Sequence, residues 1–136
     1  MTGILIVSHG DTAPSLLALA NMIVGEVPYA ETVSFDPTEG MEDLEAHVDA
    51  ALSKLQETDW VLALADIPGG SPANVLGKKV LQSGRIELLT GVNAPMLLEA
   101  VLSRAHCSRE ELLEKAFHAG REGIQDVRKL LEMDVD

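Results

Sequence analysis

The chain has 136 residues, the length of one ordinary domain, and we expect a single domain over residues 1–136. Hydrophobic residues make up 46% of it and aromatic residues only 3%, so the core has to be built from aliphatic side chains. The formal net charge of -12 argues against nucleic acid and anionic membrane surfaces as partners.

The first half of the chain predicts two β–α units. Ile4–Val7 is continuously apolar, as in a strand that is buried on both faces. Apolar residues at helical spacing follow, and Gly25 would end that helix. Thr32–Phe35 alternates between polar and apolar residues, which indicates an edge strand. A second helix over residues 41–55 has acidic residues at its start, where the helix dipole favours anions.

The second half repeats this pattern. Trp60–Ala65 predicts another fully buried strand, Ser71 is placed as the N-cap of a helix that runs to about Ser83, and Ile86–Leu89 predicts a fourth, shorter strand. A fourth helix begins at about Pro95.

The last predicted helix opens with a capping box formed by Ser108 and Glu111. Its apolar stripe comprises Leu112, Leu113, Ala116, Ile124, Val127 and Leu131. Gly120 and Gly123 weaken this helix, so a break can occur there. Strands that alternate with helices predict the α/β class, with an open, doubly wound parallel sheet and helices on both faces.

Ligands of open parallel sheets bind beyond the carboxyl ends of the strands. His9 directly follows the first strand, and Asp66 ends the third. A carboxylate at the end of an apolar strand is costly to bury without a partner, and a histidine on a neighbouring strand end could be that partner. A hydrogen bond from one ring nitrogen would fix the tautomer and leave the other nitrogen as a nucleophile. A structural loop histidine and an aspartate that caps its own loop remain the alternatives.

The segment after Asp66 predicts an anion site. Gly69 and Gly70 would let the backbone approach a ligand, and a helix that starts at Ser71-Pro72 would offer unpaired N–H groups to a phosphate. Glycines before a capped helix are also a common structural turn. With Gly10, which follows the histidine, these residues form the predicted phosphate-binding set.

Several absences narrow the chemistry further. The sequence contains no P-loop, Rossmann fingerprint or kinase signature, so a phosphoryl group would come from another protein. The single cysteine, Cys107, excludes an internal disulfide and favours a reducing, cytoplasmic compartment. No metal motif of the CxxC type is present, so we expect no metal, and we also expect no cofactor.

Three motifs now resemble a known family: Ser8-His9-Gly10, residues 66–72 ending in Gly-Gly-Ser-Pro, and residues 91–97 (GVNAPML), followed late in the chain by GREG at 120–123. The chain resembles the IIA component of the mannose-type (mannose/fructose/sorbose) family of the bacterial phosphoenolpyruvate-dependent sugar phosphotransferase system. The resemblance covers nearly the whole length. Ile67-Pro68 departs from the aromatic residue or leucine of many relatives but removes no reactive group.

The resemblance implies four parallel strands in the order 2-1-3-4 and a homodimer. It implies a phosphotransferase in which His9 accepts a phosphoryl group from phospho-HPr and yields it to a IIB partner for sugar uptake. Asp66 would orient the ring, and Ser71 with nearby amides would hold the phosphate. Association with the membrane components IIC and IID would be indirect.

Two other functions remain open at this stage. A lone IIA domain could act as a phosphorylation-dependent regulator through the same His9. A small metal chelatase of the sirohydrochlorin type also begins with a strand that leads into a histidine-glycine pair. That enzyme needs a second histidine at another strand end, and none of His47, His106 or His118 is expected there.

Overall fold

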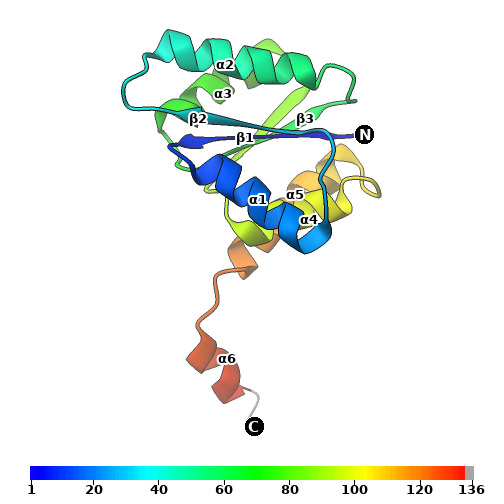
Figure 1. Cartoon of the computed structure of the whole chain (residues 1–136). Helices are drawn as coiled ribbons and strands as arrows, with labels where there is room; N and C mark the ends of the chain where they lie inside the picture. The colour runs from blue at the N-terminus through cyan, green and yellow to red at the C-terminus, as the bar shows by residue number, and fades with distance from the viewer. Residues whose placement is uncertain (134–136) are drawn as a thin grey trace.

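A computed structural model of the chain describes residues 1–133 (Figure 1). Four strands alternate with helices along the chain, and further helices complete it. The elements are β1 (Gly3–His9), α1 (Thr12–Val24), β2 (Ala30–Phe35), α2 (Met41–Lys54), β3 (Val61–Ala65), α3 (Ser71–Gln82), β4 (Ile86–Thr90), α4 (Ala94–Ser103), α5 (Arg109–Glu122) and α6 (Val127–Met133). The predicted elements are therefore present, with ends shifted by one to a few residues.

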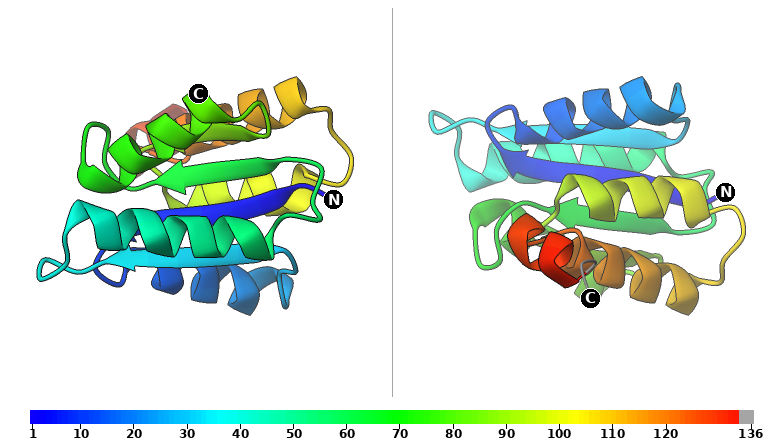
Figure 2. Two further views of the ribbon diagram at one scale, coloured as in Figure 1. Left: turned by 90° about the horizontal axis from the view of Figure 1, so that it is seen from above. Right: turned by 90° about the horizontal axis from the view of Figure 1, so that it is seen from below.

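The four strands form one parallel sheet in the order β2-β1-β3-β4, which confirms the predicted topology. Helices α2 and α3 cover one face, and α1, α4 and α5 cover the other (Figure 2). The sheet is thus doubly wound. β1 and β3 are neighbours although α1, β2 and α2 separate them in the chain, so the strand order changes direction between them. Their carboxyl ends border the crevice in which such sheets bind ligands.

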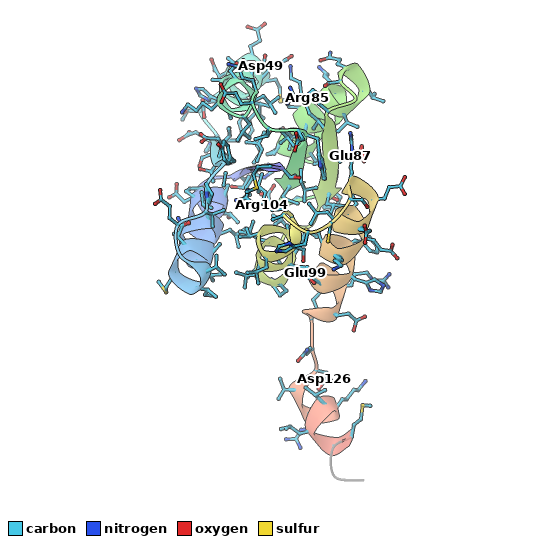
Figure 3. All side chains as sticks on the ribbon, turned by 90° about the vertical axis from the view of Figure 1, so that its right-hand side faces the viewer. Asp49, Arg85, Glu87, Glu99, Arg104 and Asp126 are labelled. Atoms are coloured by element: carbon cyan, nitrogen blue, oxygen red, sulfur yellow. The ribbon has the colours of Figure 1, made fainter. Side chains whose placement is uncertain are left out.

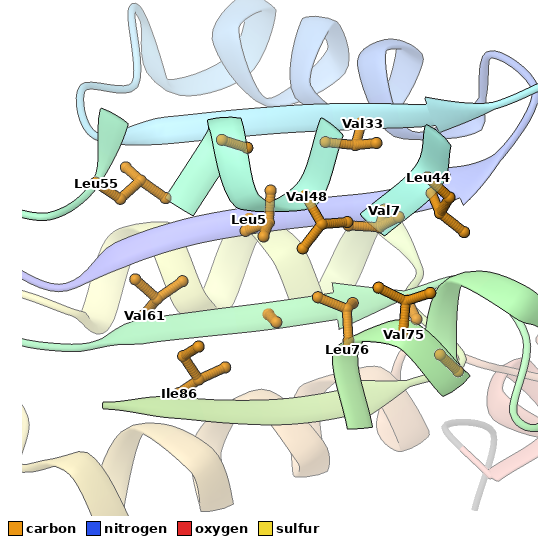
Figure 4. Packing of buried hydrophobic residues seen from close by; sticks show 14 residues of the cluster. Leu5, Val7, Val33, Leu44, Val48, Leu55, Val61, Val75, Leu76 and Ile86 are labelled. Atoms are coloured by element: carbon orange, nitrogen blue, oxygen red, sulfur yellow. The ribbon is translucent and has the colours of Figure 1, made fainter. Parts of the chain in front are cut away.

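Successive residues of the central strands face opposite sides of the sheet and pack under different helix layers. Leu5 and Val7 face the cluster under α2 and α3 (Figure 4), whereas Ile4 and Ile6 face the cluster under α1, α4 and α5. All four side chains are fully buried. Burial on both faces explains why β1 is continuously apolar in sequence. It also holds the end of β1 rigidly in place, and with it the residues that follow.

A buried arginine directly after α4 is bonded to the segments that precede β1 and β2. Arg104, which is labelled in Figure 3, is 6% exposed. Its guanidinium donates to the carbonyl oxygens of Thr2 (3.1 Å) and Pro28 (2.6 Å). Burial lowers the pKa of Arg104. Within residues 1–133, no carboxylate lies at ion-pair distance from it. Within these residues, the guanidinium of Arg104 is therefore hydrogen-bonded only to backbone carbonyls.

The last predicted helix is interrupted. The capping box is present, since the Ser108 hydroxyl accepts the Glu111 N–H at 3.2 Å and the Glu111 carboxylate accepts the Ser108 N–H at 3.2 Å. The helix ends at Glu122, however, and α6 lies apart from the domain (Figure 1). A Cβ atom on Gly123 would overlap Pro95, so the glycine allows the end of α5 to approach the start of α4 closely.

The predicted apolar stripe of the last helix is therefore buried only in its α5 half. Leu112 and Ala116 of α5 are buried, whereas Val127 and Leu131 of α6 are 60% and 59% exposed. The two halves do not share one packed face because residues 123–126 separate the helices. Among residues 1–133, no helix combines the length and the apolar character needed to cross a membrane.

Candidate active site

His9 and Asp66 meet at the carboxyl ends of adjacent strands. The sheet pairs Val7 with Ala65, so His9 at the end of β1 lies close to Asp66, which directly follows β3. The Oδ2 atom of Asp66 lies 2.9 Å from Nδ1 of His9 and also accepts the His9 backbone N–H at 3.0 Å. The other oxygen, Oδ1, accepts the N–H of Ile67 at 2.9 Å. The predicted histidine–aspartate contact is thus present.

The environment of Asp66 favours its ionised form. Partial burial by itself would raise the pKa of this carboxyl, but the hydrogen bonds from the His9 backbone and ring, together with that from Ile67, lower the pKa below its ordinary value. An ionised carboxylate only accepts hydrogen bonds, so Nδ1 of His9 carries a proton in this contact. In the neutral ring, Nε2 then has the free lone pair. The His9 side chain is 44% exposed, which leaves it accessible from solvent.

Gly70 provides the space for the histidine ring. A Cβ atom built on Gly70 would lie 3.0 Å from Cε1 and 3.7 Å from Nε2 of His9. The backbone of Gly70 has φ -77°, which any residue can adopt, so its lack of a side chain matters here for space and not for conformation. The ring therefore packs directly on the backbone at the start of α3.

Helix α3 starts at Ser71, as predicted, but the predicted N-cap role of Ser71 is wrong. Gly70 occupies the N-cap position, Ser71 is the first helical residue and Pro72 the second, so Ser71 does not cap the helix through its side chain. The Asn74 N–H bonds to the Gly70 carbonyl at 2.9 Å. In the described chain the N–H groups of Ser71 and Ala73 have no hydrogen-bond partner, as expected in a first helical turn. They remain available to an anion, together with the positive end of the helix dipole.

Two neighbouring loops are held in specific conformations. Gly69 has φ +79°, and its carbonyl accepts the Asn74 side-chain amide at 3.3 Å. Gly10 has φ +54°, and its N–H donates to the Phe35 carbonyl at 2.9 Å. Both φ values lie in the left-handed region, which glycine adopts without steric cost. Gly10 thus lies in the loop that follows His9, and Gly69 lies in the loop that precedes α3.

Sequence reasoning assigned no role to two residues that lie beside His9, Ser8 and Phe35. Ser8 is fully buried, and its hydroxyl accepts the Ala13 N–H at 2.7 Å, which anchors the start of α1 directly after the site loop. The Phe35 ring lies edge-on to the His9 ring, with centroids 6.0 Å apart. A polar residue at the end of an apolar strand was a usable signal for Ser8. The Phe35 contact depends on strand register and had no local signal.

The other histidines lie away from this site. His47 is on α2 and has its Nδ1 atom 3.2 Å from a Glu39 carboxylate oxygen, while His106 follows α4 and His118 is on α5. Residues 1–133 contain no cluster of three or more histidine, cysteine or acidic side chains that could hold a metal ion. The second strand-end histidine required by a chelatase is therefore not found in this part of the chain.

An alanine at Gly70 should perturb the site without unfolding the domain. The new methyl group would press on Cε1 of His9, and because Asp66 holds the other side of the ring, the ring must shift by a few tenths of an ångström. We expect the predicted phosphorylation of His9 to slow about tenfold, since small misalignments of a nucleophile are costly. The free energy of unfolding should change by no more than about 1 kcal/mol.

Rapid-quench phosphorylation and urea unfolding would measure the two effects. Gly84→Ala is the matched control, because a Cβ on Gly84 meets no atom within 4 Å. An unchanged transfer rate in Gly70→Ala would contradict the role assigned to this close contact.

The fold and this geometry define an α/β protein with a histidine–aspartate pair beside the N-terminus of a helix. Comparison with known proteins assigns the chain to a family. Residues 3–117 match the family model described as "PTS system fructose IIA component". The chain belongs to this family, the EIIA components of the mannose/fructose/sorbose type of the phosphotransferase system.

Individual relatives agree with this assignment. The chain is 38% identical over 126 residues to the mannose-specific EIIAB component of Escherichia coli K12, a match that covers 92% of this chain and 39% of that protein. The chain thus spans about two fifths of the length of that relative. It is 32% identical over 132 residues to the fructose-specific EIIA component of Bacillus subtilis, covering 97% of this chain and 90% of that protein.

Solved structures show the same similarity. EIIA from Streptococcus agalactiae superposes with a TM-score of 0.87 at 29% identity, covering 95% of this chain and 99% of that one. The mannose/sorbose-specific IIA subunit from Enterococcus faecalis has a TM-score of 0.84 at 29% identity, covering 92% and 93%. The structural similarity therefore covers more than nine tenths of the chain.

Proposed function

We propose that this protein is a cytoplasmic phosphocarrier of a sugar phosphotransferase system. It accepts a phosphoryl group from the phosphohistidine of HPr on Nε2 of His9 and passes it to a IIB partner for sugar uptake. The observation that carries the proposal is the arrangement of the His9 ring. Its Nδ1 is bonded to Asp66, while Cε1 and Nε2 pack against the backbone at the start of α3.

The transfer is a direct exchange of one P–N bond for another. The Nε2 lone pair of the neutral His9 ring attacks phosphorus, and the P–N bond of the donor breaks as the new bond forms. The donor imidazole recovers its lone pair, and no proton needs to move. The phosphorylated ring carries positive charge, which the Asp66 carboxylate stabilises through the proton on Nδ1.

The phosphate oxygens would be held at the start of α3. The free N–H groups of Ser71 and Ala73, the Ser71 hydroxyl and the helix dipole all favour an anion there. Gly69, Gly70 and Gly10 keep side chains away from the approach to His9. Phosphoryl transfer depends on alignment and charge stabilisation, and these residues supply both.

The partners follow from this function. The net charge of -12 suits a donor and an acceptor with basic docking surfaces and disfavours nucleic acid. We include in the proposal a homodimer and an indirect association with the membrane components IIC and IID through IIB.

The proposal is tested by incubating the protein with phosphoenolpyruvate, enzyme I and HPr from the same organism and measuring its intact mass. We expect one acid-labile phosphoryl group on the wild-type protein and none on His9→Gln, which keeps a polar side chain but lacks the nucleophile. His47→Gln is the control, because that histidine lies on α2 and contacts Glu39. Failure of the wild-type protein to accept the group from its own HPr would refute the proposal.

A further inference from the structure

An aromatic side chain from β2 packs against the candidate nucleophile. Phe35 is the register partner of His9 in the parallel pairing of β1 and β2, so the two side chains project to the same face of the sheet. Their rings lie in an edge-to-face arrangement with centroids 6.0 Å apart and an interplanar angle of 65°. The Gly10 N–H also donates to the Phe35 carbonyl at 2.9 Å, which ties the loop after His9 to the end of β2.

The His9 ring is thereby contacted from both neighbours of β1. Asp66 and Gly70 follow β3 on one side, and Phe35 ends β2 on the other. A single hydrogen bond at Nδ1 sets a distance but still lets the ring tilt about it, and the Gly70 and Phe35 contacts restrict that tilt. Phe35 is itself partly buried against the hydrophobic cluster under α2 and α3, so packing limits its own rotamers.

We propose that Phe35 is a positioning residue that holds the His9 ring in the orientation for transfer and covers one side of the ring against water. This inference rests on the proposed phosphocarrier function. A carrier has to keep its phosphoryl group until the acceptor arrives. The competing reaction is hydrolysis, in which water attacks phosphorus, the P–Nε2 bond breaks, and dihydrogen phosphate leaves with both protons of the water. An apolar ring beside the histidine lowers the access of water to that bond.

Phe35→Leu tests the proposal because it keeps an apolar side chain in the cluster but removes the ring edge. We expect hydrolysis of isolated phospho-protein to become roughly two- to tenfold faster, and phosphorylation by HPr to slow by a similar factor, the size of effect expected for one aromatic contact. Phe35→Tyr keeps the ring and should restore both rates to near the wild-type values.

A second measurement does not depend on phosphorylation. The ¹⁵N chemical shifts of the His9 ring report its tautomers. We expect one tautomer, protonated on Nδ1, in the wild-type protein and a mixture in Phe35→Leu, because a ring that tilts away from Asp66 loses the hydrogen bond that fixes the Nδ1 proton. Phe117→Leu is the matched control, since Phe117 is the other phenylalanine of the chain, lies on α5 and contacts Arg121. Thermal unfolding of each variant shows that the fold is retained.

The outcomes separate the two proposals. A wild-type protein that is not phosphorylated refutes the proposed function, while the tautomer measurement still tests the positioning role. A Phe35→Leu protein that folds, keeps the single tautomer and hydrolyses at the wild-type rate overturns the role of Phe35. The same faster hydrolysis in Phe117→Leu would also overturn it, because the effect would then not arise from contact with His9.

Discussion

Replacing Asp66 with asparagine should slow phosphorylation of His9 by about 10³-fold while the protein stays folded. Both oxygens of Asp66 accept N–H donors: Oδ2 takes two from His9, and Oδ1 takes one from Ile67. An asparagine can accept at only one of these positions, because its amide nitrogen is a donor. If that nitrogen faces His9, the Nδ1 atom must accept instead, the ring proton moves to Nε2, and the nucleophilic lone pair is lost.

The charge of Asp66 contributes in the same direction. Its pKa is lowered in the folded protein, so at neutral pH the carboxylate is ionised and can stabilise the positive phosphorylated ring. Asparagine removes this stabilisation even if the tautomer is kept. Single-turnover phosphorylation by phospho-HPr would measure the combined effect.

Asp11→Asn provides the matched control for this experiment. Asp11 lies two residues from His9 and makes no side-chain capping bond to α1, so the substitution removes one nearby negative charge but no contact of the ring. We expect less than about a threefold change in its transfer rate. Equal losses in Asp11→Asn and Asp66→Asn would contradict a specific role for the hydrogen bond, as would a wild-type rate in Asp66→Asn.

Replacing Arg104 with methionine should lower the free energy of unfolding by about 2–3 kcal/mol. Methionine can fill the space of the aliphatic part of the side chain, but it leaves the carbonyl oxygens of Thr2 and Pro28 without their guanidinium donors. Those bonds connect α4 to the start of β1 and to the segment before β2, which lie far apart in the sequence. Urea unfolding monitored by circular dichroism would measure the change.

Arg85 offers a matched control of the same residue type. Its guanidinium, labelled in Figure 3, also donates to two backbone carbonyls, those of Gln56 and Thr58. Arg85, however, is exposed. Water can replace the lost donors there, so we expect Arg85→Met to cost no more than about 1 kcal/mol. If both variants lose the same stability, burial is not the reason for the effect of Arg104.

Much of the fold was predictable because its signals are local. Ile4–Val7 and Trp60–Ala65 are apolar on every residue, a pattern typical of strands covered on both faces, and both become central strands. The capping box at Ser108 likewise predicted the start of α5 correctly. The break before α6 also lies where Gly120 and Gly123 predicted a weak point in the last helix. The close approach of Gly123 to Pro95 is a contact between helices, which local pattern cannot specify.

Some features of the candidate site were likewise predictable from the sequence, and others were not. The sequence by itself placed His9 and Asp66 at strand ends, put glycines before a helix start and determined the family through its motifs. Only the tertiary structure decided which ring nitrogen meets Asp66, that Gly70 and not Ser71 precedes the first turn of α3, and that Phe35 contacts His9. The physical reason is that strand order and register bring together residues from three separate segments, and atomic distances between such segments are properties of packing.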